Sequence, residues 1–292
     1  MRGALENVFF MQHEPSTNML QAYLSLSIGE SQTLAYILAV LYLALGVTAL
    51  VQLIRIQLRL PEYGWTTQKV FHLLNVMCLF ARGVLFFIFP DEWLVNIADP
   101  PARPLFYYTA FLLPGQIYFT TYTLLILFWA EIYHQARSLP LKHLRPAFFA
   151  CNSVVYILPL AISVSQMKES SNPHMKLVLK YAMTSVVCLV WLSAAAGFVF
   201  YGGRLFVMLR RFPLESKGRR KKLQEVGAVA GVSTVAFVVR AALFAILAFM
   251  TDSTYVQFAY FLVCEIVPTA IILTVLRKLP PKRTPDGYHA IR

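Results

Sequence analysis

Charged residues are scarce in this sequence, and their scarcity argues against an ordinary water-soluble protein. Asp, Glu, Lys and Arg make up 14% of the 292 residues, whereas soluble globular chains carry about 25%. Hydrophobic residues reach 58%, and the mean hydropathy is +0.60. A chain with so little polar material cannot cover a folded domain in water, so we expect a membrane protein.

Motifs that are typical of enzymes and metal sites are also missing from the sequence. It contains no Gly-rich phosphate loop, no nucleophile elbow and no carboxylate pair in a recognisable catalytic motif, so we expect neither an enzyme nor a bound cofactor. All four cysteines (Cys78, Cys151, Cys188 and Cys264) lie within apolar runs. Their spacing matches no metal-ligand pattern, and isolated cysteines in such surroundings usually act as small hydrophobic residues. The sequence therefore predicts no disulfide framework and no metal site.

The sequence has instead several apolar runs that are long enough to cross a bilayer. One crossing needs roughly 20 apolar residues in a helix, and seven runs meet this length. We predict an all-α fold, a seven-transmembrane helix bundle with receptor-like topology. The predicted spans are 33–54, 69–89, 105–130, 146–166, 178–204, 226–250 and 255–276. The third span contains Pro114 and Gly115, which predict a kink or a break because proline removes a backbone donor.

Lys and Arg are distributed unequally between the two sides that seven crossings define. Nineteen of them fall in the odd-numbered loops, the adjoining helix ends and the C-terminal tail, and five fall on the opposite side. An excess of Lys and Arg is typical of the cytosolic side of a membrane protein. We therefore predict a lumenal N-terminal segment at 1–32, a transmembrane domain at 33–276 and a cytosolic basic tail at 277–292.

Basic residues on the predicted cytosolic side form a candidate surface for partners. One interpretation is a topogenic cluster that attracts anionic lipid headgroups, at about 1 kcal/mol per cation, and the other is a docking surface for a cytosolic protein. Direct nucleic-acid binding is not expected, because the cations lie in short gaps between apolar runs rather than on a soluble face. The candidate partner-binding residues are Arg137, Lys142, Arg145, Arg210, Arg211, Lys217, Arg219, Arg220, Lys221 and Lys222.

Three ionisable residues lie deep within the predicted spans, namely Arg82, Arg240 and Glu265. Counted from the predicted cytosolic ends of their helices, they lie roughly 18 to 23 Å along the helix axes, so they can share one layer. A lone charge near the bilayer centre costs at least ~2.5–3.5 kcal/mol, and pairing is therefore expected. One interpretation is a structural salt bridge between the second, sixth and seventh spans, and the other is a ligand or proton site. Because two arginines face one glutamate, we expect an anionic ligand or an arginine that reaches a lumenal cavity.

Polar residues in the third span allow two interpretations. Gln116, Thr120, Thr121 and Thr123 follow one another closely within this run. Such residues line a cavity in some membrane proteins, and in others they bond to neighbouring helices. The sequence alone leaves both interpretations open.

Four segments spread along the chain are long and chemically unusual, namely IQLRLPEYGWTTQKVFHLLN (Ile56 to Asn75), FWAEIYHQARSLP (Phe128 to Pro140), YGGRLFVMLRRFPLESKGRRKKLQEVG (Tyr201 to Gly227) and EIVPTAIILTVLRKLPPKR (Glu265 to Arg283). They resemble the plant tobamovirus multiplication (TOM) family of seven-helix membrane proteins. The resemblance implies a multi-pass protein of the plant vacuolar membrane (the tonoplast). It also implies a host factor that binds the helicase region of tobamovirus replication proteins, anchors the viral RNA replication complex and works with an Arf-like small GTPase. The family is distantly similar to animal orphan-receptor-like lysosomal membrane proteins.

The sequence departs from rhodopsin-like receptors, which also have seven helices. Its third span ends in Glu131-Ile132-Tyr133 instead of an acid-Arg-Tyr motif, and its seventh span has no Asn-Pro-x-x-Tyr run. Our leading hypothesis is a membrane scaffold whose cytosolic face recruits soluble partners. The alternative is a seven-helix receptor or small-solute transporter that uses the intramembrane layer of ionisable residues.

Overall fold

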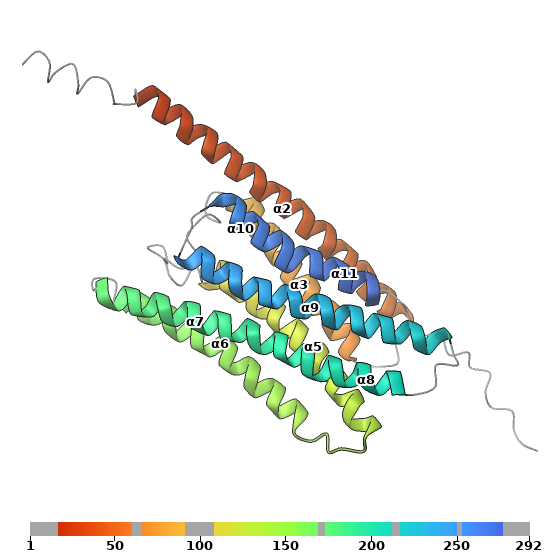
Figure 1. Ribbon diagram of the computed structural model, residues 1–292. Coiled ribbons are helices and arrows are strands. Elements are labelled where there is room, and N and C mark those ends of the chain that lie inside the picture. Colours follow the sequence, from red (N-terminus) through yellow and green to blue (C-terminus); the bar gives the residue numbers. More distant parts are fainter. Residues whose placement is uncertain are drawn as a thin grey trace, which may run out of the picture.

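The structure, a computed structural model, is helical throughout most of the part of the chain that it describes. That part comprises residues 17–59, 66–90, 108–168, 173–211, 217–249 and 253–276, with side chains described except at 17–28, 111 and 211–223. Within it, seven helices are long and apolar enough to cross a membrane (Figure 1). The predicted all-α, seven-helix fold is therefore confirmed, and the chain is a multi-pass membrane protein. The side of the membrane that each end faces stays a prediction from the distribution of charge.

The helices follow the predicted spans in order. Their bounds are α2 Thr17–Arg59, α3 Thr67–Ile88, α5 Leu113–Ala136, α6 Leu144–Lys168, α7 Pro173–Gly197, α8 Gly203–Arg211, α9 Lys217–Phe249, α10 Thr254–Phe261 and α11 Val267–Leu276. Three π-helical segments accompany them, namely η2 Tyr108–Leu112, η3 Phe198–Gly202 and η4 Leu262–Ile266. Each π-helical segment continues directly into the α-helix that follows. As a result η2–α5, α7–η3–α8 and α10–η4–α11 each form one continuous crossing.

Helix ends agree with some local sequence signals and overrule others. Thr66 caps α3, and its hydroxyl accepts a hydrogen bond from the backbone nitrogen of Lys69 at 3.4 Å. Helix α2 begins at Thr17 and so extends well before the predicted span 33–54, whose boundary with the N-terminal segment stays a prediction. The gap between the predicted spans 178–204 and 226–250 is partly helical rather than a loop throughout, since α9 begins at Lys217. Lys and Arg have high helix propensity, so a basic run that adjoins an apolar helix readily continues it.

Proline does not break the third crossing, contrary to one of the two outcomes that the sequence predicts. Pro114 lies at the start of α5, and the π-helical segment η2 runs directly before it. The π-helical segment η4 likewise runs directly before Pro268 in the seventh crossing. A proline ring clashes with the carbonyl four residues earlier, and a π turn changes the local register of the helix. Two interior prolines are thus accommodated within continuous crossings.

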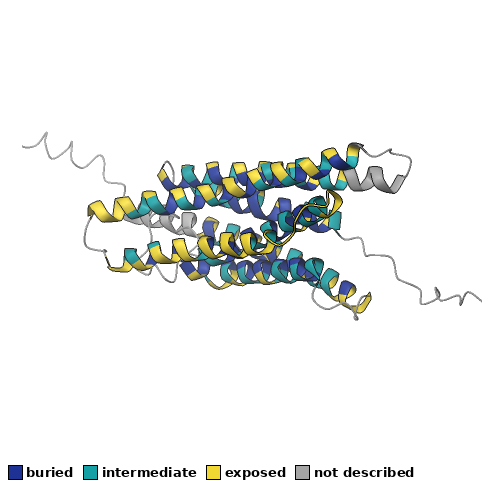
Figure 2. Ribbon diagram, turned by 90° about the horizontal axis from the view of Figure 1, so that it is seen from below, coloured by how far each residue is buried: buried dark blue, intermediate teal, exposed yellow. Residues whose placement is uncertain are grey.

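Apolar side chains cover the outside of the bundle, while many polar side chains are buried inside it. Leu58, Phe149 and Phe87 are 76%, 66% and 62% exposed, whereas His72 and Gln257 are fully buried. Figure 2 shows the buried residues on the helix faces that turn inward and the exposed residues on the outer faces. This distribution is the reverse of that in a soluble protein, and it suits a surface that contacts lipid.

Small residues allow two close approaches between helices, as the runs Ala194 to Gly197 and Gly202-Gly203 predict. A Cβ atom added to Gly197 would lie 2.9 Å from the Cδ1 atom of Ile126 on α5. One added to Gly202 would lie 2.8 Å from the Cβ atom of Ala230 on α9. No atom lies within 4 Å of the equivalent position at Gly203. Only the first glycine of the Gly202-Gly203 pair is therefore required for packing.

Candidate functional site

Arg82, Arg240 and Glu265 meet in the interior of the bundle, where they form the central charge cluster. Arg82 comes from α3, Arg240 from α9 and Glu265 from η4. The Oε1 atom of Glu265 accepts hydrogen bonds from Arg82 Nη2 at 3.1 Å and from Arg240 Nη2 at 2.5 Å. The three residues are 3%, 2% and 1% exposed, respectively. The ionisable residues that the sequence placed in one layer thus lie in direct contact, and solvent does not reach them in this conformation.

A fourth residue, Tyr42, completes the hydrogen bonding of the glutamate. Its hydroxyl donates to the Oε2 atom of Glu265 at 2.6 Å, and its side chain is 1% exposed. Both carboxylate oxygens therefore accept hydrogen bonds, which a buried carboxylate requires to offset its desolvation. Tyr42 lies on α2, so the cluster joins the first, second, sixth and seventh crossings.

Aromatic rings surround the guanidinium group of Arg240. Its Cζ atom lies 4.0 Å from the ring centroid of Trp191, 5.0 Å from that of Tyr260 and 5.3 Å from that of Tyr118. A cation over an aromatic face gains about 2 kcal/mol or more when both groups are desolvated. The excess positive charge predicts an anionic ligand or an arginine that reaches a lumenal cavity, and the anionic ligand stays a prediction. In the described structure both arginines are buried, and aromatic faces surround one of them.

The dipeptide Pro114-Gly115 brings the backbone of α5 against the central charge cluster. A Cβ atom built on Gly115 would lie 3.5 Å from Arg82 Nη2 and 3.6 Å from Arg240 Nη2. The thiol of Cys78 on α3 donates to the carbonyl oxygen of Pro114 at 3.2 Å. A Cβ atom at this position would be in ordinary van der Waals contact with both guanidinium groups, so this part of α5 lies directly beside the cluster.

Polar side chains of α5 also donate to carbonyl groups that interior prolines leave unpaired. A proline removes the N–H group that would bond the carbonyl four residues earlier, so Pro159 frees Val155 and Pro268 frees Cys264. Gln116 Nε2 donates to the Val155 carbonyl at 3.1 Å, and the hydroxyl of Tyr118 donates to the Cys264 carbonyl at 3.1 Å. Helix α5 thus satisfies freed backbone groups on two neighbouring crossings.

Gln116, Thr120 and Thr123 form bonds between helices, one of the two roles that the sequence left open, whereas Thr121 donates to the Ile117 carbonyl of α5 itself. Thr120 donates to Asn152 Oδ1 on α6 at 2.8 Å, and Asn152 Nδ2 lies 3.3 Å from Thr123 Oγ1. Tyr108 in η2 contacts both Gln116 and the backbone of α6, with its hydroxyl 3.0 Å from each acceptor. In the described structure these groups serve helix association between α5 and α6.

The predicted partner-binding residues lie apart from this cluster, at one end of the bundle. Arg137, Lys142, Arg145 and Arg210 are exposed. The Nε atom of Arg145 forms an ion pair with Glu131 Oε1 at 2.9 Å. Arg211 and the basic residues from Lys217 to Lys222 lie within α8 and α9, and their side chains are outside the described part. Figure 1 shows the turn between α5 and α6, the end of α8 and the start of α9 at the same end of the molecule.

Comparison with known proteins assigns the chain to a family. A model of the THH1/TOM1/TOM3 domain matches residues 24–292. The chain belongs to this family. It is 46% identical to tobamovirus multiplication protein 1 of Arabidopsis thaliana over 258 residues, which cover 86% of this chain and 85% of the relative. It is 44% identical to tobamovirus multiplication protein 3 of Arabidopsis thaliana over 264 residues, which cover 88% of this chain and 84% of the relative. No solved structure matches the chain.

The family assignment confirms the resemblance to TOM proteins, and it extends across nearly all of the chain. Tobamovirus multiplication protein 1 of Nicotiana tabacum is also 44% identical, over 88% of this chain and 88% of its own length. These relatives are plant proteins, and their names refer to virus multiplication rather than to a catalysed reaction. In this TOM-family chain, the described residues include no group of three or more His, Cys, Asp or Glu residues that could hold a metal ion.

The sequence did not predict the aromatic residues that contact the central charge cluster. Tyr42, Trp191 and Tyr260 occur in apolar runs, where an aromatic residue carries no sign of which way it points. Lys69 begins the predicted second span and counts among the cations of the predicted cytosolic side, and the structure buries it at the start of α3 with 2% exposure. The only available signal for the aromatic residues was the unbalanced charge of the buried arginines.

Proposed function

We propose that this protein is a plant membrane host factor that tobamoviruses use for their multiplication. The observation that carries the proposal is the family match over residues 24–292, together with relatives named tobamovirus multiplication proteins 1 and 3 at 44–46% identity. These relatives align over at least 84% of their own length. The proposal therefore concerns the whole membrane domain rather than a shared fragment.

In the proposed mechanism the protein is a scaffold that recruits viral replication proteins through their helicase region. It anchors the viral RNA replication complex at the vacuolar membrane, with an Arf-like small GTPase as a second partner. Exposed cations at one end of the bundle, among them Arg137, Lys142 and Arg210, support an electrostatic contact with acidic protein surfaces. Tethering to a membrane raises the local concentration of the bound proteins.

The geometry of the central charge cluster supports a scaffold more than a receptor or transporter. A receptor or transporter that used this layer would need a route for a ligand or ion to reach Glu265. In the described conformation, Glu265 bonds three side chains and is 1% exposed. The cluster therefore supports a structural role in which it holds four crossings together.

A binding assay with charge-matched variants tests the proposal. One variant replaces Arg219, Arg220, Lys221 and Lys222 with Gln, and the control replaces Arg277, Lys278, Lys282 and Arg283 with Gln. Each removes four cations from the predicted cytosolic side. Correctly inserted protein is used to capture the helicase domain of a tobamovirus replication protein and an activated Arf-like GTPase. We expect the first variant to lose capture of the helicase domain and the control to retain it.

Equal capture by both variants and the unchanged protein would exclude a role for the basic start of α9. Failure of the unchanged protein to bind the helicase domain would overturn the proposed scaffold function itself. Multiplication of a tobamovirus in plant cells that lack the protein, and in cells that express each variant, supplies a second measurement. Unaltered multiplication without the protein would contradict the proposed host-factor role.

A further inference from the structure

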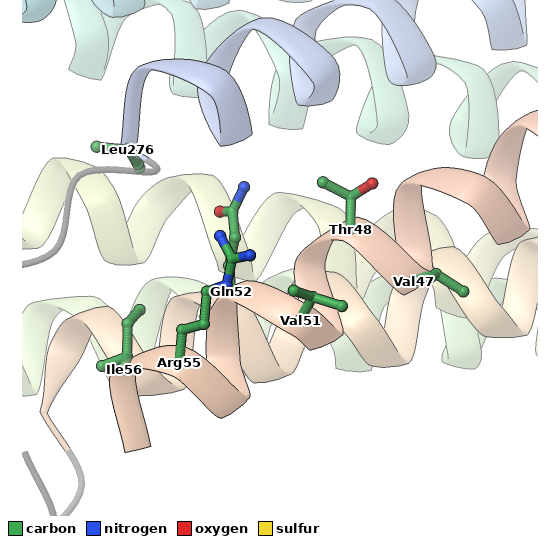
Figure 3. Close-up of a pocket in the computed structure, with 7 residues that line it drawn as sticks. All are labelled: Val47, Thr48, Val51, Gln52, Arg55, Ile56 and Leu276. Carbon is green, nitrogen blue, oxygen red and sulfur yellow. The ribbon is translucent and has the colours of Figure 1, made fainter. Parts of the chain in front are cut away.

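A groove between α2 and α11 opens on the outer surface of the bundle. It has a volume of about 300 Å³ and is lined by Val47, Thr48, Val51, Gln52, Arg55, Ile56 and Leu276. Figure 3 shows the side chains of Gln52 and Arg55 extending from α2 into this space, with Leu276 on the opposite helix. The volume is at the lower end of the range for ligand pockets, so the groove suits part of an extended molecule.

The lining of the groove combines exposed apolar side chains with a polar pair on α2. Val47 and Val51 are 52% and 41% exposed and form its apolar part. Gln52 and Arg55 form its polar part, and Thr48, Ile56 and Leu276 complete the lining. Arg55 lies about 12 Å along the helix axis from Val47 at 1.5 Å per residue. Arg55 is therefore nearer the predicted cytosolic surface than Val47, as the headgroup of a phospholipid is nearer that surface than its acyl chains.

The polar part of the groove has both an unused acceptor and a cation. Gln52 Nε2 donates to the Leu273 carbonyl at 3.2 Å, a bond that fixes the orientation of the amide. The Oε1 atom of Gln52 is buried and accepts no hydrogen bond from the described residues. Arg55 is exposed and forms no ion pair with any residue in the described part of the chain. A matching ligand therefore supplies an anion for Arg55 and a hydrogen-bond donor for Gln52.

We propose that the groove between α2 and α11 binds a phospholipid whose anionic headgroup carries hydroxyl groups, of which phosphatidylinositol is the representative. Its phosphate pairs with Arg55, a headgroup hydroxyl donates to Gln52 Oε1, and an acyl chain lies along Val47 and Val51. Phosphatidic acid offers the phosphate without a headgroup hydroxyl, and phosphatidylcholine has no net charge. The site is independent of the proposed viral partners, which would contact the end of the bundle.

Photo-crosslinking in vesicles tests this site. The full chain is reconstituted in phosphatidylcholine vesicles that contain a small amount of photoactivatable phosphatidylinositol, and labelled peptides are identified by mass spectrometry. We expect labels on α2 and α11 around the groove. The Arg55→Gln variant is expected to reduce labelling there roughly fivefold, the factor that corresponds to about 1 kcal/mol per cation near a membrane. The control is Arg204→Gln, which removes an exposed arginine from α8 and is expected to leave the labelling unchanged.

Two further variants separate the headgroup contacts from the acyl-chain contacts. Gln52→Leu is expected to abolish the preference for phosphatidylinositol over phosphatidic acid, because it removes the acceptor of the hydroxyl. Val51→Phe is expected to reduce labelling with both lipids, because it fills the apolar part. Glycerophosphoinositol, which has the headgroup but no acyl chains, is expected not to compete.

Three results would overturn the proposal. The first is equal labelling of the groove by a photoactivatable phosphatidylcholine, which would show a non-selective lipid contact. The second is unchanged labelling in the Arg55→Gln variant despite a correctly folded chain. The third is full competition by glycerophosphoinositol, which would show a soluble headgroup site rather than a lipid site.

Discussion

Removing the negative charge of Glu265 is expected to be the most destabilising single change in the central charge cluster. The Glu265→Gln variant preserves the shape of the side chain but removes the only carboxylate that Arg82 and Arg240 contact in the described structure. The cluster then holds two buried cations and no anion. Removing one partner of a buried ion pair typically costs about 3–5 kcal/mol. Against a total stability of about 5–15 kcal/mol for a folded protein, a loss of this size is readily measured.

Charge balance predicts a smaller loss of stability for the Arg82→Met variant. It leaves the ion pair between Arg240 and Glu265, at 2.5 Å, with no excess charge. It removes one hydrogen bond of 3.1 Å to Glu265, and hydrogen bonds to charged groups contribute about 1.5–3 kcal/mol. We therefore expect a smaller loss than in Glu265→Gln. The double variant is expected to lose less unfolding free energy than the two single variants together. It leaves only one buried cation, Arg240, which lies among aromatic rings.

The free energy of unfolding of the four proteins, measured by denaturation in the same detergent, gives the coupling energy directly. Coupling within one ion-pair network is typically about 0.5–3 kcal/mol. Additive losses would refute the argument that the two residues stabilise each other. A Glu265→Gln variant of unaltered stability would refute the structural role itself, and loss of a ligand response in that stable variant would support a receptor or transporter.

Two further pairs of variants test local features by the same unfolding measurement. Gly202→Ala is expected to lower the stability by about 1–3 kcal/mol, because its Cβ atom would lie 2.8 Å from α9. Gly203→Ala is expected to be neutral or up to about 1 kcal/mol stabilising, since that position is open and alanine favours helix, and equal effects of the two would contradict the packing argument. Tyr118→Phe is expected to cost about 1–3 kcal/mol by leaving the Cys264 carbonyl without its donor. Tyr255→Phe removes a hydrogen bond from an exposed side chain and is expected to change little, so a similar loss in both would point to a general effect of removing a hydroxyl.

Features that depend on distance along a single helix were predictable from the sequence. The seven crossings follow from the length and apolarity of their runs, which no tertiary contact alters. The depth of Arg82, Arg240 and Glu265 follows from a rise of about 1.5 Å per residue. Their contact was predictable because a lone charge in a bilayer interior is costly. These features depend only on the spacing of residues within each apolar run.

Features that depend on the rotation of one helix against another were not predictable. Tyr42 and Trp191 lie in apolar runs whose residues point both toward lipid and toward the interior. Which of them faces a guanidinium group depends on how the crossings pack. The π-helical turns η2 and η4 are also set by tertiary context, because a proline alone is compatible with a kink, a break or a change of register. The continuation of α9 into the basic run was missed because charge was taken as the sign of a loop.

Because the chain is made from its N-terminus, the pairing around Glu265 also sets an order of events during synthesis. Arg82 arrives with the second crossing and Arg240 with the sixth, while their common partner arrives with the seventh. A chain that stops before the seventh crossing has two arginines in the membrane without this carboxylate. The two buried arginines of such a shortened chain would lack the ion pairs that stabilise the full one. A chain without the seventh crossing is therefore expected to be less stable in the membrane than one that contains it.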